Sequence, residues 1–365
     1  MIGRGTGDMA HSRPTLADVA STAGVSVSTA SLAFSGSGPI AEETRARVLA
    51  AAERLGYSGP NPLGRSLRSG RSGIAAVIIG DHLRRSFRDP VAIQVLDGLT
   101  GALGQLGLGV LLIPALPDPE RPTAVDPLVE SAAMDAAVLI WGFRTDDPVL
   151  AVLRRRGVPV VVGEGPSTTT APVVSIDDQT GSAALGRHLL ELGHERVAVV
   201  SLPFDAARRC GPVDAARRAQ LDWAPTRHRL LGLESVGIRP TVVMEAEASL
   251  VEAGREAGLR VLQGGPGERP TAVVAQSDLL AAGVLIAARE LGLRVPDDVS
   301  VAGFDGLDLP WLAPDVLTTV VQPLQARGEA MGRMVGRLLA GEEPEDMVFD
   351  VELRVGTTTA PPPPR

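Results

Sequence analysis

The sequence predicts an α/β protein preceded by a small helical domain. From Ile74 to about residue 303, short apolar runs rich in Val and Ile alternate with helical stretches, whereas residues 15–55 carry helical patterns alone. Continuous apolar strands separated by helices are typical of parallel sheets covered by helices on both faces. The number of alternations is enough for two such sheets. We therefore expect two Rossmann-like subdomains with a cleft between them.

The N-terminal region reads as three short helices. Thr15 is suited to cap a first helix, and Gly24 is suited to end it in a left-handed conformation. After a short turn, Ser26 precedes a second helix at about 27–34. A third helix follows at about 42–55, with these side chains expected to face inward: Val48, Leu49, Ala52 and Leu55. Such an arrangement fits either a helix-turn-helix or an ordinary three-helix domain that makes no DNA contact.

The alternating region supplies the expected elements of the core. Strands are predicted at 74–79, 109–113, 136–141, 158–162, 173–176, 196–201, 241–244, 271–275 and 299–303. Helices are predicted at 91–106, 124–133, 147–156, 179–192, 226–236, 249–262 and 278–291. Residues 202–225 break the rhythm and are expected to form a long loop.

Charge and composition limit the classes of function. The net charge is −8, but residues 1–73 hold eight Arg against five Asp or Glu, so this segment is +3 and the remainder is −11. A basic segment on an acidic protein is consistent with a local nucleic-acid contact. The single cysteine, Cys210, excludes an internal disulfide, and no apolar stretch is long enough to span a membrane. We expect a cytoplasmic protein.

These observations divide the chain into five parts. They are a disordered leader at 1–13, a three-helix domain at 14–58, a linker at 59–73, an α/β core at 74–358, and a disordered proline-rich tail at 359–365. The linker carries only Leu63 and Leu67 as an apolar pair, so it can fold only against a partner.

Three motifs in order resemble the LacI/GalR family of transcription regulators. They are TLADVASTAGVSVSTASLAFSGSGPIAEETRARVLAAAERLGY from Thr15, DDQTGSAALGRHLLELGHERVAVV at 177–200, and AVVAQSDLLAAGVLIAARELGLRVPDDVSVAGFDGLDLP at 272–310, followed by LTTVVQP at 317–323. The resemblance implies that residues 14–58 are a helix-turn-helix DNA-binding domain and that residues 59–73 are a hinge that forms a helix. It implies that residues 74–358 are a ligand-binding and dimerisation core like that of periplasmic sugar-binding proteins. It implies a repressor that binds a pseudo-palindromic operator as a homodimer and is gated by a sugar or nucleoside-like effector.

By this resemblance the second helix reads DNA. Val27 and Ser28, and Leu32 one turn later, occupy the base-reading positions, where relatives often carry polar residues and an Arg. Valine and leucine offer no hydrogen bonds to base edges, so we expect weak direct readout. Short hydroxyl side chains nearby are suited to phosphates or to helix capping: Thr15, Ser26, Thr29 and Ser31. The resemblance assigns three hinge residues to DNA as well: Asn61, Arg65 and Leu67, the last as a minor-groove wedge.

Ligand residues are expected at the carboxyl ends of strands. The resemblance places Arg229 and Ser277 at the cleft. Asp278 and Asp305 end or follow strands that point to it, although Asp278 is equally suited to cap the next helix. Position after a strand adds Asp81 and Phe143, while Trp141 suits either the cleft or the core. Asp177 is either a ligand contact or the cap of its own helix.

No catalytic or metal-binding constellation stands out, and no cofactor is expected. His194 and Glu195 are not followed by a second histidine at metal-ligand spacing, and no phosphate loop or nucleophile elbow occurs. The alternative is an α/β binding protein or enzyme whose helix-turn-helix has lost its base-reading role. The ending TTTAPPPPR cannot form a heptad helix, so we expect a dimer rather than a tetramer.

Overall fold

The computed structural model describes residues 14–35, 38–59, 70–116, 124–141, 143, 147–165, 171–265 and 267–364. The predicted leader at 1–13 and most of the hinge, 60–69, lie outside these residues. The chain divides into two compact units, Met1–Ser72 and Gly73–Arg365.

The N-terminal unit contains three helices around a small aliphatic core. They are α1 (Leu16–Ala23), α2 (Val27–Ser35) and α3 (Glu42–Leu55). Thr15 and Asp18 form a capping box, and Gly24 ends α1 at a φ of 67°, as predicted. Leu49 is 42 % exposed, so its expected inward position was wrong. Val48, Ala51, Ala52 and Leu55 follow the helical repeat, and Leu49 falls outside that stripe.

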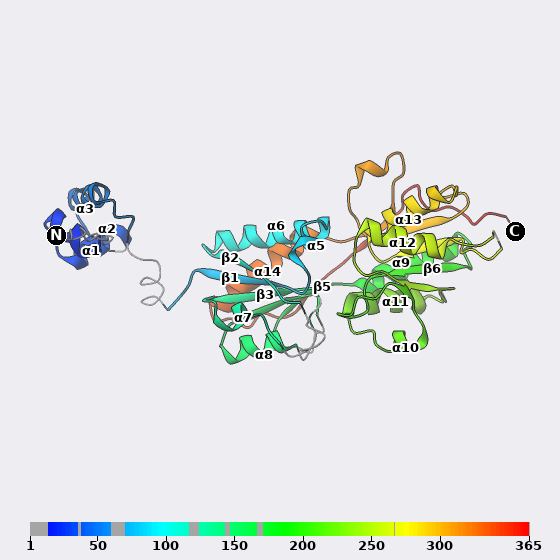
Figure 1. The fold of residues 1–365 in the computed structure, drawn as a ribbon, viewed down its shortest axis with the longest axis horizontal. Helices are drawn as coiled ribbons and strands as arrows, with labels where there is room; N and C mark the ends of the chain where they lie inside the picture. Colours follow the sequence, from blue (N-terminus) through cyan, green and yellow to red (C-terminus); the bar gives the residue numbers. More distant parts are fainter. Residues whose placement is uncertain are drawn as a thin grey trace, which may run out of the picture. The chain divides into compact units, whose positions relative to one another are not determined.

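The first subdomain of the large unit is a parallel six-stranded sheet in the order β12-β5-β4-β3-β1-β2 (Figure 1). Its strands are β1 (Ile74–Ile79), β2 (Gly109–Pro114), β3 (Ala136–Ile140), β4 (Val160–Gly163), β5 (Val173–Ile176) and β12 (Met347–Phe349). Its helices are α5 (Leu83–Ser86), α6 (Pro90–Gln105), α7 (Pro127–Ser131), α8 (Pro148–Arg155) and α14 (Leu324–Leu339).

The second subdomain is a seven-stranded sheet in the order β13-β11-β10-β9-β6-β8-β7, parallel except for β7 and β13. Its strands are β6 (Val197–Ser201), β7 (Gly211–Pro212), β8 (Val243–Glu245), β9 (Ala272–Ala275), β10 (Ser300–Asp305), β11 (Thr318–Val321) and β13 (Glu352–Arg354). Its helices are α9 (Asp178–Glu191), α10 (Ala215–Arg218), α11 (Ala224–Ser235), α12 (Val251–Val261), α13 (Asp278–Glu290) and the 3-10 turn Pro310–Leu312.

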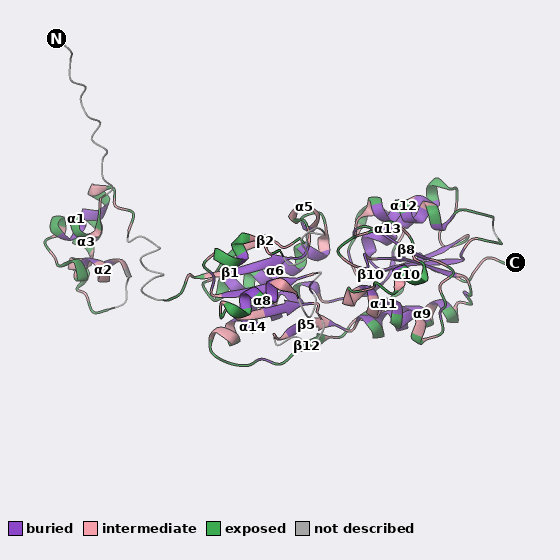
Figure 2. Cartoon of the chain, turned by 60° about the horizontal axis from the view of Figure 1, so that its bottom comes forward, coloured by how far each residue is buried: buried purple, intermediate pink, exposed green. Residues whose placement is uncertain are grey.

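Both sheets are covered on both faces, which explains the uninterrupted apolar strands. On β1, Val77 and Ile79 face the cluster under α6 and α14, while Ala76 and Ile78 face the cluster under α7 and α8. The second sheet lies in the same way between α12 and α13 on one face and α9 and α11 on the other. The central strands of each sheet are therefore buried between two helical layers (Figure 2). The predicted fold class is confirmed.

The chain passes between the two sheets three times. The connections run from β5 to α9, from β11 to α14, and from β12 to β13. These three connections hold the subdomains side by side. The carboxyl ends of most β-strands face the space between the subdomains. The order of crossing was not predicted, because α14 and the last three strands were not assigned.

Two predictions in the second subdomain were wrong. The expected long loop at 202–225 contains β7 and α10, which are too short to give a sequence period. The tail expected to be disordered from 359 is hydrogen-bonded at Ala360. Its amide donates to Ser300 Oγ at 3.1 Å, and its carbonyl lies 2.9 Å from His194 Nε2.

Candidate functional site

A cavity of about 140 Å³ lies between the two subdomains. It is lined from the first subdomain by residues that follow β1, β3 and β4, and by the start of α6. From the second it is lined by residues at or after the ends of β6, β8, β9, β10 and β11, and by the start of α11. Ligand sites in open parallel sheets are expected at this edge. The volume suits a small molecule rather than a polymer.

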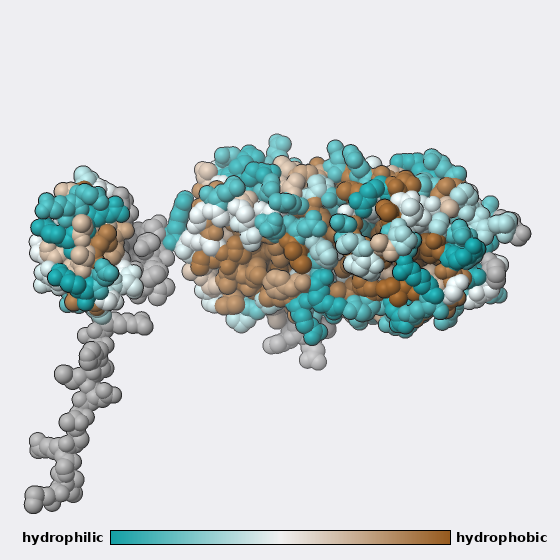
Figure 3. Space-filling model, turned by 90° about the horizontal axis from the view of Figure 1, so that it is seen from above, coloured by the Kyte–Doolittle hydropathy of each residue, from teal (hydrophilic) through white to brown (hydrophobic). Residues whose placement is uncertain are grey.

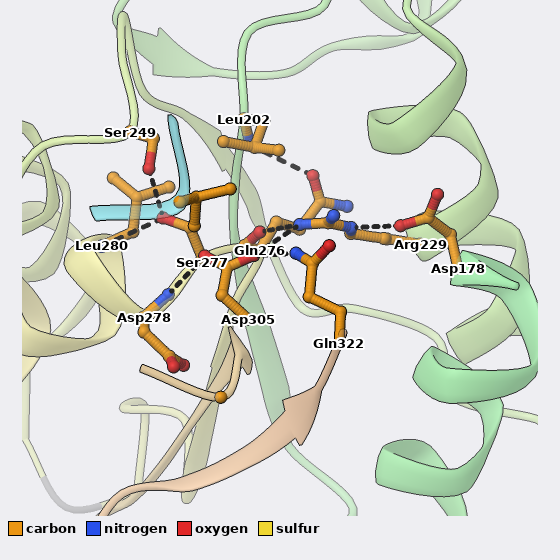
Figure 4. Close-up of polar contacts among 12 residues, drawn as sticks. Asp178, Leu202, Arg229, Ser249, Gln276, Ser277, Asp278, Leu280, Asp305 and Gln322 are labelled. Carbon is orange, nitrogen blue, oxygen red and sulfur yellow. Dashed lines mark hydrogen bonds and ion pairs between the residues drawn. The ribbon is translucent and has the colours of Figure 1, made fainter. Parts of the chain in front are cut away.

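Arg229 on α11 is the buried centre of this cavity's polar network, and its side chain is 5 % exposed. Its Nε donates to Asp178 Oδ1 at 2.7 Å, its Nη1 donates to the carbonyl of Gln276, and its guanidinium lies 3.7 Å from the centre of the Phe304 ring. Figure 4 shows the side chain between Asp178 on one side and Gln276 and Asp305 on the other. Burial alone would lower the pKa of Arg229, but the carboxylates of Asp178 and Asp305 raise it.

Asp305, the last residue of β10, faces Arg229. Its Oδ1 accepts a 2.7 Å hydrogen bond from Gln322 Nε2 and lies 3.9 Å from Arg229 Nη1, and its Oδ2 accepts from the amide of Asp278 at 3.3 Å. Burial raises the pKa of Asp305 well above the ordinary value, and Arg229 opposes that shift. The carboxyl group is thus oriented before any ligand arrives.

Backbone strain is concentrated around this cavity. Among the described residues, four that are not glycine have positive φ: Trp141 at 61°, Glu164 at 64°, Arg208 at 46° and Asp305 at 135°. All four line the cavity. Such conformations cost about 1–3 kcal/mol each and persist where surrounding contacts hold them, often at binding sites. Their shared location is independent support for a functional site here.

A second polar chain reaches the cavity from α14. Arg327, which is 2 % exposed, donates to Gln322 Oε1 and to Glu164 Oε1. Gln322 in turn donates to Asp305. A carboxylate of the first subdomain is therefore linked through Arg327 and Gln322 to a carboxylate of the second.

Five of the seven predicted ligand residues line the cavity: Asp81, Phe143, Arg229, Ser277 and Asp305. Trp141, for which core and cleft were both open, lines it too. Asp177 and Asp278 are not among the lining residues. Asp177 Oδ1 caps α9 through the amide of Thr180 at 2.9 Å.

Asp278 is buried behind the cavity and holds the strand ends in place. Its oxygens accept from the amide of Leu307 at 2.7 Å and from Thr319 Oγ1 at 2.6 Å. Burial raises the pKa of Asp278 to about 6, although the bonds from Thr319 and Leu307 lower it. The suggested capping role belongs instead to Ser277, whose Oγ accepts from the amide of Leu280 at 3.2 Å.

Sequence reasoning missed several lining residues: Arg85, Asp89, Glu164, Arg208, Trp223 and Gln322. Glu164 directly follows a strand and Trp223 directly precedes a helix, so position could have identified both. Arg208 lies in an irregular segment with no periodic signal. In the sequence, Asp89 before Pro90 is typical of a helix cap. In the structure it does cap α6, because its Oδ1 accepts from the amide of Val91 at 2.9 Å.

The predicted base-reading positions lie at the start of α2. Val27 is 51 % exposed and Ser28 is exposed, whereas Leu32 is half-buried, with its side chain beside Gly38. Ser26 Oγ accepts from the amide of Thr29 at 3.1 Å and lies 2.8 Å from Ser28 Oγ. Ser26 therefore caps α2 while remaining exposed. Thr15 is also exposed, and Thr29 and Ser31 are half-buried. Asn61, Arg65 and Leu67 lie outside the described residues.

Metal-binding clusters and membrane-spanning helices are both absent from the described residues. These residues contain no group of histidine, cysteine and acidic side chains that could hold a metal ion. None of their helices is long and apolar enough to cross a membrane.

The comparisons agree with this geometry. Residues 15–61 match the family described as bacterial regulatory proteins, lacI family, and residues 187–359 match the periplasmic binding protein-like domain. An HTH-type transcriptional regulator of Mycobacterium tuberculosis, Rv3575c, is 32 % identical over 96 % of this chain and 98 % of its own length.

Two solved structures share the fold over nearly the whole chain. A LacI family transcriptional regulator from Corynebacterium glutamicum has a TM-score of 0.71 at 28 % identity, covering 94 % of this chain and 98 % of the other. The complex of the transcriptional regulator CelR with cellobiose has a TM-score of 0.65 at 26 % identity, covering 95 % and 100 %.

A helix-turn-helix unit joined to a two-subdomain core with a central cavity defines a DNA-binding transcriptional regulator that responds to a ligand. The chain belongs to the LacI family of bacterial regulatory proteins.

Proposed function

We propose that this regulator is a repressor that binds a pseudo-palindromic operator as a homodimer and is gated by a small polyhydroxylated ligand, such as a sugar. The observation that carries the ligand assignment is the preorganised Arg229–Asp305 pair facing a cavity between two subdomains. Guanidinium and carboxylate groups make paired, charge-assisted hydrogen bonds to hydroxyls.

Apolar surfaces of the cavity fit the same class of ligand. Trp141, Phe143 and Trp223 line it, and flat aromatic faces suit the C–H faces of sugar rings. The similar CelR structure is a complex with cellobiose. Nucleosides present hydroxyls and a flat ring as well, so they belong in the same screen.

Gating follows from a ligand that contacts both subdomains. Binding of such a ligand favours the arrangement in which the two subdomains are closed around it. The three connections between the sheets allow the subdomains to move as two rigid bodies. A coupling of about 1–3 kcal/mol would change operator affinity about 5–150-fold. We propose that DNA is contacted by Val27, Ser28 and Leu32 of α2, by the hydroxyls of Thr15, Ser26, Thr29 and Ser31, and by Asn61, Arg65 and Leu67 of the hinge.

We propose a homodimer formed through an apolar patch on the first subdomain. Ile93 and Leu106 on α6, Val110 on β2, and Leu116 just beyond β2 are between 37 % and 47 % exposed. Because α6 and β2 run antiparallel and are in contact at the end of the strand order, we assign the four side chains to one apolar edge of this subdomain. An apolar area on this subdomain is visible in Figure 3. Exposed apolar patches of this kind mark association surfaces.

We propose that the protein acts by binding alone, in the cytoplasm where it meets the chromosome. The described residues that line the cavity include no histidine and no cysteine. Its arginines and most of its carboxylates are bonded to one another, to backbone groups or to other polar side chains, rather than arranged as a nucleophile and its base.

The test is a ligand screen followed by a DNA-release assay. The full chain is screened for a rise in melting temperature with neutral mono- and disaccharides, including cellobiose, and with nucleosides, since binding stabilises by RT ln(1 + [L]/Kd). Each hit is then added to the complex with an operator selected from a randomised pseudo-palindromic library. The expected result is a hit that changes operator affinity at least about fivefold.

Asp305→Ala tests the site assignment in the same two assays. We expect the variant to lose the ligand response and keep DNA binding. Asp308→Ala is the matched control, because Asp308 is exposed three residues further along the chain, in the loop after β10, and does not line the cavity. An unchanged ligand response in Asp305→Ala would show that the ligand binds elsewhere.

A further inference from the structure

Arg208 lines the cavity and is a point at which the second subdomain reaches the first. It lies between β6 and β7, yet its Nη2 is 3.1 Å from Asp81 Oδ2 and 3.5 Å from the carbonyl of Gly80, both just beyond β1 of the first subdomain. On its own side, Nη1 donates to the carbonyl of Glu247 at 3.4 Å. The Arg208 guanidinium thus contacts both subdomains at once.

The surroundings of Arg208 hold this bridge in place. The side chain is 15 % exposed and its guanidinium lies 4.8 Å from the centre of the Trp223 ring, so two lining residues of the second subdomain support each other. Its backbone φ of 46° is unfavourable for arginine and is maintained by these contacts. On the far side, Asp81 is also held by Arg85 at 3.3 Å.

We propose that Arg208 is the latch of the cavity, the residue whose bond to Asp81 and Gly80 keeps the two subdomains closed and thereby couples the occupied site to the closed state. This rests on the proposed ligand-gated function and assigns its closure to one contact. Asp81 is the receiving carboxylate, and Trp223 is a positioning residue for the guanidinium. A ligand that enters or leaves must break the bridge.

A second ion pair crosses the same cleft and provides a control. Arg88, between α5 and α6, bonds to Glu252 on α12. Neither residue lines the cavity, and their side chains are 52 % and 66 % exposed. An exposed pair of long side chains contributes little to stability, so this contact should not hold the subdomains together.

The experiment measures opening without ligand or DNA. The full chain contains three tryptophans, and in a Trp223→Phe, Trp311→Phe background Trp141 of the first subdomain alone reports on the cavity. A phenylalanine at position 223 keeps an aromatic ring for the Arg208 guanidinium, so the bridge is retained in this parent. Acrylamide quenching of Trp141 is compared between this parent and Arg208→Gly, which removes the bridge and suits the positive φ. We expect the quenching constant to rise about twofold as the open form becomes the major one.

Three further variants make the outcome decisive. Asp81→Asn cuts the bridge from the other side and should raise quenching similarly, and the Arg208→Gly, Asp81→Asn double variant should be no more open than either single variant. Arg88→Ala should match the parent. Far-UV circular dichroism verifies that each variant is folded. Parental quenching in both Arg208→Gly and Asp81→Asn, or an equal rise in Arg88→Ala, would overturn the latch.

The two proposals can fail separately. Normal ligand-dependent DNA release together with parental quenching in the latch variants would refute the latch and leave the proposed function intact. Increased quenching in the latch variants of a protein whose DNA binding responds to no ligand would support the latch and refute the proposed function.

Discussion

At the level of single residues, the cavity depends on charges that are buried in pairs. Arg229 and Asp178 are each about 5 % exposed and are bonded to each other. Removing one member of a buried pair typically costs about 3–5 kcal/mol, because the other is left uncompensated. A lost ligand response in Arg229→Ala would therefore be difficult to separate from partial unfolding. Asp305 faces the ligand space, and its removal leaves Arg229 paired with Asp178, so Asp305 is the better position for a functional test.

Asp89 should make the protein's stability depend on pH. Burial raises its pKa from 3.8 to about 6, helped by the charges of Asp81 and Glu164 and opposed by the amide of Val91. An acid whose pKa is raised by folding binds its proton more tightly in the folded state. It therefore reduces stability progressively as pH rises from its unfolded pKa to its folded pKa, and by a constant amount above that.

Asp89→Asn should remove this penalty. The amide oxygen can still cap α6, so we expect a gain in the free energy of unfolding that grows between pH 3.8 and about 6 and reaches up to about 3 kcal/mol at neutral pH. Urea unfolding of both proteins from pH 4.5 to 8 measures it. Asp126→Asn is the control, because Asp126 caps α7 in the same Asp-Pro arrangement outside the cavity. A gain that does not change with pH, or an equal gain in the control, would contradict the assignment.

At the level of elements, helices α6 and α14 are in backbone contact through glycine. A Cβ on Gly98 would lie 2.1 Å from the carbonyl oxygen of Gln325, and one on Gly328 would lie 2.0 Å from that of Val95. Any side chain at these positions must push the two helices apart. The close approach of α14 thus requires glycine on both helices.

Gly98→Ala should therefore destabilise the first subdomain by about 1–3 kcal/mol, the usual cost of overpacking. Gly101→Ala, one turn later on α6, meets no atom within 4 Å and should stabilise by about 0.5–1 kcal/mol through helix propensity. Chemical denaturation of the two variants measures the difference. Equal effects at both positions would show that the helices are not packed this closely.

The side chains of α2 limit how this protein can read bases. Val27 and Leu32 can offer base edges only apolar contact, so phosphate contacts and the hinge must supply a larger share of operator affinity. Leu67→Ala should then weaken binding more than Ser28→Ala does. Leu32→Arg should shift one half-site position toward guanine, which an arginine fork recognises with about 1–3 kcal/mol of discrimination.

Binding of these variants to a randomised pseudo-palindromic library at fixed salt tests both statements. An unchanged sequence preference for Leu32→Arg would mean that this position does not reach the bases, in keeping with its half-buried side chain beside Gly38. Unchanged operator affinity for Leu67→Ala would show that the hinge does not enter the minor groove.

Periodicity predicted the elements that are long or buried on both faces and failed on the others. Strands such as β1 and β9 are apolar throughout, α9 has an apolar stripe, and α13 is buried along almost its whole length, so their positions were confirmed to within a few residues. β12 and β13 are three residues long and half-exposed, which leaves no pattern to read. Strand ends identified Asp81 and Asp305, whereas Arg208 reaches the cavity only through tertiary structure.

At the scale of the whole molecule, the cavity and the apolar edge both involve the first subdomain. This subdomain lines the cavity with Asp81, Asp89, Trp141 and Glu164. Its strand β2, which carries part of the apolar edge, is the edge strand of the sheet. A shift of this subdomain on ligand binding would therefore be transmitted to its copy in a dimer. Ligand and operator would be linked through one association surface.

This predicts that a charge in the apolar patch abolishes both dimerisation and specific DNA binding. Ile93 is 47 % exposed near the start of α6, and in a symmetric dimer Ile93→Glu would place a carboxylate at the interface from each chain without a partner. We expect a monomer by light scattering at micromolar concentration and a loss of operator affinity of about 10³-fold, since one chain can engage only one half-site. Leu190→Glu is the control, because Leu190 is similarly exposed, at 40 %, on α9 of the second subdomain. A mass of two chains for Ile93→Glu would place the dimer interface elsewhere, and a mass of four for the unmodified chain would contradict the dimer itself.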